Sequence, residues 1–248
     1  MKKIMFLVVA IIFATNLVAQ DKEDQGNKKK EGKLEQGDRI VVDLFTDLWQ
    51  KLPSSSLMST TWFNRGVNVY GMRDLPLGKT NFSIGLGAGI SCHNLYSDGI
   101  LARQVDTNLN YTGKVVFQKI PSKSVSGTDV SYKVNKLTVV YVDIPLEFRF
   151  RTKNSQFKFA IGAKGGMAIG SHSKYSGDDF SNPIDPTLNI KEKQNGIPNI
   201  MGYHYGAIAR IGWKYVSLSA FYSLTPLFKK DKGPDMYPIS VGITITPM

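Results

Sequence analysis

The feature that most constrains the fold of this chain is an alternation of apolar and polar residues with a period of two. It is clearest in residues 137–151, where apolar side chains alternate with Asp143, Glu147 and Arg149. The eight segments that show it are residues 39–48, 62–72, 82–93, 137–151, 157–170, 201–212, 216–227 and 239–247. Successive side chains of a β-strand point to opposite faces, so each segment predicts a strand. No amphipathic helix of useful length lies between them, which predicts an all-β chain.

The connections between these segments alternate in length. Residues 94–136 and 171–200 are long, whereas residues 152–156 and 213–215 are tight turns. A soluble sandwich has no reason to gather its long loops at one end, but an outer-membrane barrel has short periplasmic turns and longer outer loops. Residues 38–248 are therefore predicted to form an eight-stranded antiparallel up-and-down transmembrane β-barrel, with both chain ends on the periplasmic side.

A membrane location agrees with the apolar face of the strands and with the aromatic residues near their ends. Hydrocarbon offers no hydrogen-bond partners, so a spanning sheet must close on itself and turn an apolar face to lipid. Outer-membrane lipid is therefore the first partner that the sequence predicts for this chain. Aromatic rings with a polar atom favour the membrane–water boundary. The rings assigned to two interfacial girdles are Trp49, Trp62, Phe63, Tyr203, Tyr205, Trp213, Tyr215 and Tyr237. In a soluble barrel the same rings would be ordinary core residues.

The opposite face of the predicted strands carries charges of both signs. Eight strands enclose a lumen that side chains can fill, so these charges are predicted to pair into an ionic plug. The lumen set is Asp43, Asp47, Asp143, Glu147, Arg39, Arg149, Arg151, Lys158, Lys164 and Arg210. Charges inside a membrane protein often line a transport path, which is the alternative. Arg65 shares the lipid-facing side with Val67 and Val69, where it either snorkels to the interface or marks a bulge or a shifted register.

The N-terminal 20 residues have the pattern of an export signal. Lys2 and Lys3 precede an unbroken apolar run from residue 4 to residue 14. A spanning helix needs about 20 apolar residues, so residues 1–20 are predicted to be a signal peptide, cleaved after Ala19 or Gln20. A buried N-terminal helix is the alternative. Residues 21–37 are charged and lack aromatics, which predicts a flexible periplasmic tail.

Composition narrows the classes of function. The formal net charge of +11 becomes +9 when the signal, with two lysines and no acids, is removed. A basic surface can bind nucleic acid, but export and the scattered positions of the bases argue against that partner. One cysteine, Cys92, excludes an internal disulfide, and the three histidines lack the spacing of a metal site. Neither a cofactor nor a metal is expected.

Two short motifs place serine close to histidine. Ser91 and His93 lie two residues apart, and Ser171 and His172 are adjacent. Nucleophilic catalysis needs a nucleophile in contact with a base, and a third group that orients the base. Nothing in these spacings indicates such contacts, so no catalytic residues are predicted and the chain is not expected to be an enzyme.

One hairpin carries a resemblance to a known family. The run YVDIPLEFRFRT at residues 141–152, followed by QFKFAIGAKGGMAIG at residues 156–170, resembles the hallmark hairpin of an outer-membrane β-barrel family abundant in Bacteroidota, which includes porin-like and PorT-like proteins. The opening run DRIVVDLFTDLW at residues 38–49 and the turn DLPLGKTNFSIGLG at residues 74–87 are also similar to sequences of that family. The resemblance implies an eight-stranded barrel in the bacterial outer membrane with no catalytic residues to carry over. For PorT-like members it implies a link to protein secretion.

These patterns together predict an integral outer-membrane barrel with a structural or partner-binding role. Binding residues concentrate on loops that a rigid scaffold holds, so residues 94–136 and 171–200, or the tail, are expected to contact other envelope or secretion proteins. The alternatives are a narrow porin-like channel for small solutes, a lipid-modifying outer-membrane enzyme, and a soluble exported calycin-like binding barrel.

Overall fold

The computed structural model describes residues 38–152, 156–182, 184–185 and 187–246, and the predicted signal peptide and tail lie outside them. The described residues contain eleven strands: β1 (Asp38–Gln50), β2 (Arg65–Pro76), β3 (Phe82–Tyr96), β4 (Gly99–Val105), β5 (Tyr111–Lys119), β6 (Tyr132–Arg151), β7 (Phe157–Asp178), β8 (Asn189–Asn195), β9 (Tyr203–Trp213), β10 (Val216–Ser223) and β11 (Tyr237–Ile245). No helix in the described ranges is long and apolar enough to cross a membrane. The all-β prediction is confirmed.

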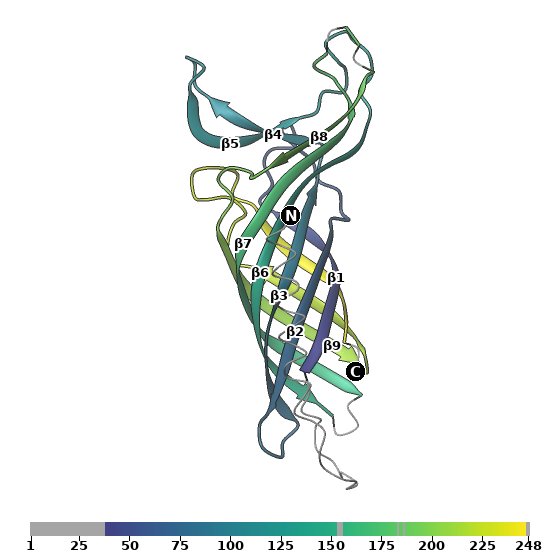
Figure 1. Ribbon diagram of the computed structural model, residues 1–248, viewed down its shortest axis with the longest axis vertical. Coiled ribbons are helices and arrows are strands. Elements are labelled where there is room, and N and C mark those ends of the chain that lie inside the picture. The colour runs from purple at the N-terminus through teal and green to yellow at the C-terminus, as the bar shows by residue number, and fades with distance from the viewer. Residues whose placement is uncertain (1–37, 153–155, 183, 186, 247–248) are drawn as a thin grey trace, which may run out of the picture. The chain divides into compact units, whose positions relative to one another are not determined.

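Eight of these strands form a closed antiparallel barrel (Figure 1). Their order around the ring is β1, β2, β3, β6, β7, β9, β10 and β11, and β11 pairs with β1 to close it. This seam runs from the Val42–Ile245 pair to the Gln50–Tyr237 pair. The predicted eight-stranded up-and-down barrel is confirmed, and closure gives each of these strands a partner on both sides, as a sheet in hydrocarbon requires.

Side chains of the barrel strands point outward and inward in turn, as the period of two predicts. On β6, Ile144 is 58% exposed, whereas Asp143 and Glu147 are 0% and 1% exposed. Exposed apolar side chains also cover the neighbouring strands and form what we call the apolar belt. The belt includes Ile40, Leu44, Val69, Leu86, Ile161, Ile211, Leu218 and Ile243. A surface that is apolar outside and charged inside fits a barrel whose outer solvent is lipid.

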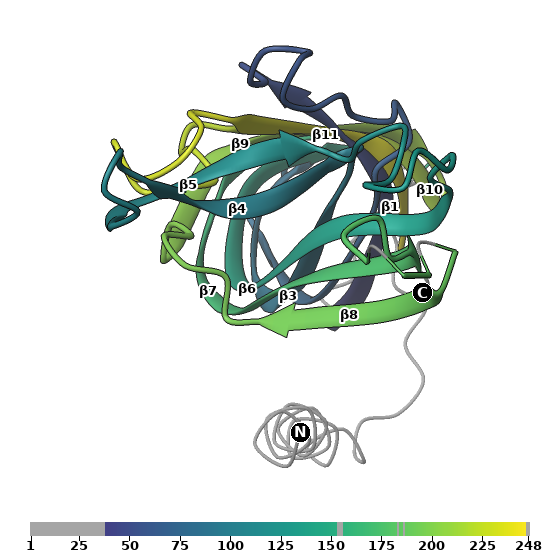
Figure 2. The same cartoon turned by 90° about the horizontal axis from the view of Figure 1, so that it is seen from above.

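The segments expected as long loops contain further β-structure, because β6 and β7 continue past the barrel (Figure 1). β8 pairs with the last residues of β7, and we call β8 with residues 132–138 and 171–178 the outer sheet. β4 and β5 pair with each other, and we call them the outer hairpin. Viewed along the barrel, the outer hairpin crosses its open end (Figure 2). Ordered strands therefore lie over part of the long-loop end of the barrel.

The start of β2 differs from the prediction, since the strand begins at Arg65 rather than at residue 62. The side-chain amide of Asn64 donates hydrogen bonds of 2.8 Å to the carbonyl oxygens of Asp47 and Thr61. Its Oδ1 accepts the backbone N–H of Tyr96 at 2.7 Å. These bonds fix residues 61–64 in a turn, and regular pairing with β1 begins only after it.

A bulge in β7 marks the place where the outer sheet leaves the barrel. Val140 of β6 pairs with Gly170, but the next residue, Tyr141, pairs with Ala168, so Ile169 has no opposite residue. A bulge bends the strand that contains it and increases its twist. The outer sheet can therefore diverge from the barrel wall while its strands stay continuous.

Candidate functional site

The lumen charges form clusters along the barrel, and the one at the short-turn end centres on Asp74 of β2. Arg149 and Arg151 of β6 donate to its two carboxylate oxygens. Nε of Arg39 lies 3.4 Å from Oδ2 of the same group. Asp74 is only 2% exposed. The prediction missed Asp74 because the predicted strand ended at residue 72, although residue 74 is the next inward position.

In the middle of the lumen, Arg210 of β9 connects two acids from other strands. Its guanidinium contacts the carboxylate of Glu147, and Nη2 lies 2.8 Å from Oδ2 of Asp43. Arg149 binds Glu147 from the other side at 2.7 Å, and the Thr244 hydroxyl donates to Asp43 at 2.7 Å. All of these side chains are buried. A buried ion is tolerated only when opposite charges and hydrogen bonds replace its water, and these contacts do so.

Asp143 of β6, which is fully buried, has the densest set of contacts. It accepts hydrogen bonds from Ser91 Oγ at 2.7 Å and His204 Nε2 at 2.6 Å, and Lys164 Nζ lies 3.1 Å away. A side chain at Gly166, which faces Asp143 across the β6–β7 pair, would overlap this carboxylate. Glycine at that position therefore makes room for the buried acid.

A second aspartate–histidine pair, Asp47 and His93, lies nearer the long-loop end. His93 Nδ1 is 3.0 Å from Oδ2 of Asp47, and the Ser240 hydroxyl donates to Oδ1 at 2.6 Å. A nucleophilic triad places the histidine between the serine and the acid. Here, as at Asp143, the serine donates to the acid directly. Within the described residues, no serine is hydrogen-bonded to a histidine.

Apolar side chains fill the lumen beyond these charges, and we call this group the apolar plug. Its members are Trp49, Met58, Leu95, Val115, Phe117, Leu137, Val139, Tyr141, Ile197, Leu227, Phe228 and Met236. The assignment of Trp49 to an interfacial girdle is wrong. Trp49 is 7% exposed, and its Nε1 donates to the carbonyl of Asn94 at 3.4 Å. It follows Asp47 at the next inward position of β1, so it points into the lumen.

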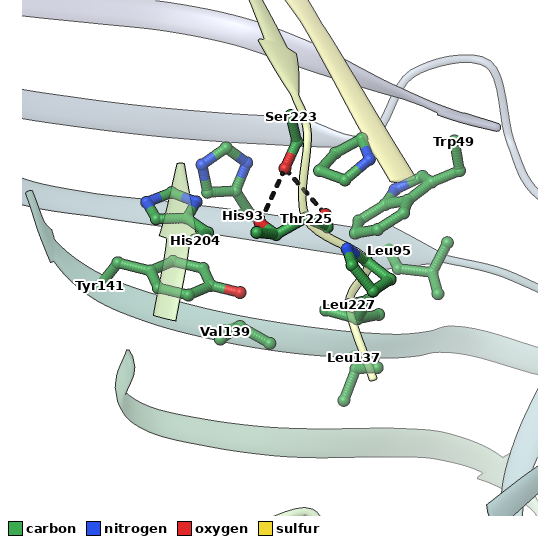
Figure 3. A pocket seen from close by; sticks show the side chains of 12 residues that line it. Trp49, His93, Leu95, Leu137, Val139, Tyr141, His204, Ser223, Thr225 and Leu227 are labelled. Atoms are coloured by element: carbon green, nitrogen blue, oxygen red, sulfur yellow. Dashed lines mark hydrogen bonds between the residues drawn. The ribbon is translucent and has the colours of Figure 1, made fainter. Parts of the chain in front are cut away.

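A small cavity remains where the apolar plug meets the charged clusters (Figure 3). Trp49, His93, His204 and Ser223 are among the residues that line it, and its volume is about 10 Å³. The ring of Tyr141 stacks on His204, with 3.9 Å between the centroids. A further cavity at the short-turn mouth has about 40 Å³. One water occupies about 10–15 Å³ by this measure, so the first cavity has room for about one water and the second for about three.

The other predicted interface aromatics lie on the outer surface. Their exposed fractions are Trp62 81%, Phe63 49%, Tyr203 53%, Tyr205 51%, Trp213 56% and Tyr215 44%, and Tyr237 is half-buried. Arg65 is exposed among them, and its guanidinium lies over the rings of Phe63 and Tyr96 at 5.8 Å and 5.5 Å. Its pairing with Thr46 is regular. Arg65 therefore reaches the interface without a bulge.

The remaining predicted lumen charge, Lys158, and the Ser171–His172 motif lie away from the charged clusters of the lumen. Lys158 is half-buried at the short-turn mouth and makes no ion pair in the described part of the chain. The Ser171 hydroxyl accepts the backbone N–H of Ile197 at 3.0 Å, whereas the half-buried His172 points to the other face of β7. No group of three or more metal-binding side chains occurs among the described residues.

The comparison with family models agrees with this architecture. A family model described as "Outer membrane protein beta-barrel domain" matches residues 52–229. Among solved structures, the chain is similar to Ail, the attachment invasion locus protein of Yersinia pestis, in complex with the heparin analogue sucrose octasulfate. The identity is 11%, the TM-score is 0.33, and the match covers 86% of this chain and 100% of that chain. No curated protein matches the sequence.

Proposed function

Because the chain belongs to the outer membrane protein β-barrel domain family, we propose that it is a non-conducting outer-membrane anchor that presents ordered β-structure to a binding partner. The observation that carries this proposal is the combination of a filled lumen with strands that continue beyond the apolar belt. The resemblance of residues 141–152 and 156–170 to a family that includes PorT-like proteins supports an envelope or secretion protein as that partner.

The filled lumen argues for an anchor rather than for a channel. A conducting barrel needs a continuous aqueous path. In this lumen, ion pairs lie along the barrel and the apolar plug lies beyond them toward the long-loop end. Opening a path would separate buried charges such as Asp143 and Lys164, and uncompensated charges in such a place cost several kcal/mol. The narrow porin-like channel is the second candidate, and conductance separates the two.

The outer hairpin is fixed to the barrel, as a presented binding surface should be. Val115 and Phe117 of β5 are 1% and 2% exposed within the apolar plug. The backbone N–H of Val115 donates to the carbonyl of Lys232 at 2.9 Å, and Asn199 Nδ2 donates to the carbonyl of Gly113 at 2.9 Å. A surface ordered before binding loses less conformational entropy when a partner docks.

The tip of the outer hairpin exposes apolar and aromatic side chains. Leu109 is 82% exposed, Val105 49% and Tyr111 46%, and Arg103 lies over the Tyr111 ring at 5.5 Å. Tyrosine and arginine are enriched where interfaces are energetically important. This tip is the part of the outer surface that we propose meets the partner.

Two measurements test the proposed function. Refolded full-length protein in planar bilayers should give no large, stable conductance, with a known porin as the positive control. In cells, a photo-crosslinking residue placed at Leu109 should capture an envelope protein, whereas the same residue at Lys79, in the turn between β2 and β3, should not. Stable channels, or identical crosslinks from both positions, would contradict the proposal.

A further inference from the structure

Three lysines line up across neighbouring strands on the outward surface of the outer sheet. Lys136 of β6 pairs with Lys174 of β7, and Lys174 pairs with Lys193 of β8. Strands lie about 4.8 Å apart, so three positively charged side chains start within about 10 Å of one another. We call Lys136, Lys174 and Lys193 the lysine row.

The height of the apolar belt places the lysine row at the level of lipid headgroups. On β6 the outward apolar positions extend from Val140 to Phe150. At about 3.3 Å per residue this is about 33 Å of strand, and a tilt of about 40° turns it into the roughly 25 Å height typical of an outer-membrane barrel. Thr138 and Lys136 are the next two positions with the same phase, and since Thr138 is only 2% exposed, Lys136 is the first of the two whose side chain reaches the outer surface.

The half-buried Lys136 contacts both polar and aromatic groups. Asn94 Oδ1 accepts hydrogen bonds from Thr138 Oγ1 at 2.6 Å and from Lys136 Nζ at 3.2 Å. The Lys136 ammonium also lies over the ring of Tyr96, at 5.5 Å from its centroid, and the Arg65 guanidinium lies at the same distance from that centroid. Amphipathic and basic side chains of this kind are typical of the boundary between hydrocarbon and headgroups.

No acid neutralises the lysine row from within the described chain. Lys174 and Lys193 are exposed and make no ion pair among the described residues, and Glu192 pairs with Tyr175 on the opposite face of the sheet. Like charges on adjacent strands repel each other. Burial lowers the pKa of the neighbouring His172, and the positive charges of the three lysines lower it further.

We propose that the lysine row binds phosphate groups on the headgroups of outer-leaflet lipid. Ammonium groups bind phosphate through charge and hydrogen bonds, and phosphates placed between the lysines would remove their mutual repulsion. The site faces lipid rather than the covered end of the barrel. This role is separate from partner binding by the outer hairpin and does not depend on the conductance of the barrel.

Native mass spectrometry of the full chain in neutral detergent tests the proposal. The probes are lipid A with two phosphates and the same lipid without phosphate. Each lysine near an anionic lipid surface contributes about a fivefold factor in affinity. Wild-type protein should therefore bind the phosphorylated lipid at least about tenfold more tightly than the lipid without phosphate. This preference should weaken with added salt. The triple variant K136Q/K174Q/K193Q should lose at least about tenfold in affinity.

A matched control removes the same charge from another part of the outer side. The variant K229Q/K230Q/K232Q changes three lysines in the connection between β10 and β11, and it should bind within about twofold of wild type. Equal losses in the two triple variants, or no preference of wild type for phosphorylated lipid, would overturn the proposal. If K136Q/K174Q/K193Q does not show the mobility of folded protein on an unboiled gel, the double variant K174Q/K193Q replaces it in the lipid-binding test. The double variant keeps the hydrogen bond between Lys136 and Asn94.

Discussion

The substitution Asp143→Asn removes one charge from the most densely bonded point of the lumen. Lys164 is 2% exposed at its side chain and has Asp143 as its counter-charge. The amide of asparagine has one acceptor oxygen, so Ser91 and His204 can no longer both donate to a carboxylate. Removing one partner of a buried ion pair costs about 3–5 kcal/mol. We expect the free energy of unfolding to fall by that amount, without a change of fold.

The measurement is urea unfolding of the refolded protein in detergent, followed by gel mobility without boiling. The double variant D143N/K164M removes both charges and should recover at least half of the loss, since no buried ion then lacks a partner. Asp235→Asn, in an exposed pair with Lys51 at 3.9 Å, is the control and should change stability by less than about 1 kcal/mol. A stability of D143N equal to that of wild type, or a double variant no better than the single one, would refute this account of the lumen.

Three further predictions concern other parts of the molecule. Trp49→Ala should lower the free energy of unfolding by about 3–5 kcal/mol, because it leaves a cavity in the apolar plug, and urea midpoints would show this. Gly166→Ala should block formation of the heat-modifiable folded form, whereas Gly170→Ala should permit it, because an added methyl group meets Asp143 at the first position and nothing within 4 Å at the second. Burial is the largest cause of the lowered pKa of His172 and the charge of Lys193 is the next, so Lys193→Gln should raise this pKa part of the way toward its ordinary value. An NMR titration that shows no rise would contradict this.

The period of two made the barrel and the direction of its side chains predictable. In hydrocarbon each strand needs one apolar face, so the positions of Asp43, Asp143 and Glu147 followed from sequence alone. The position of Trp49 was predicted wrongly because the prediction followed its residue type. The alternation of side chains along β1 gives the correct answer, since residues 43, 45, 47 and 49 share one face of the strand.

Contacts across the lumen could not be predicted in the same way. The pairs Asp47–His93 and Asp43–Arg210 join residues 46 and 167 positions apart. Which of them meet depends on the stagger of strands around the closed ring, and that stagger has no local signal in the sequence. The strands of the outer hairpin were missed for a related reason, since β4 and β5 pair mainly with each other and lack the strict alternation that lipid imposes.

The seam between β1 and β11 has a consequence for the order of assembly. It brings together residues such as Asp43 and Thr244, which are 201 positions apart. Contacts this distant in sequence carry the largest loop-closure entropy and form slowly. Until these contacts form, the new sheet has two open edges whose backbone amides and carbonyls lack hydrogen-bond partners. A strand of another protein that paired with either edge would satisfy these groups until β1 and β11 meet.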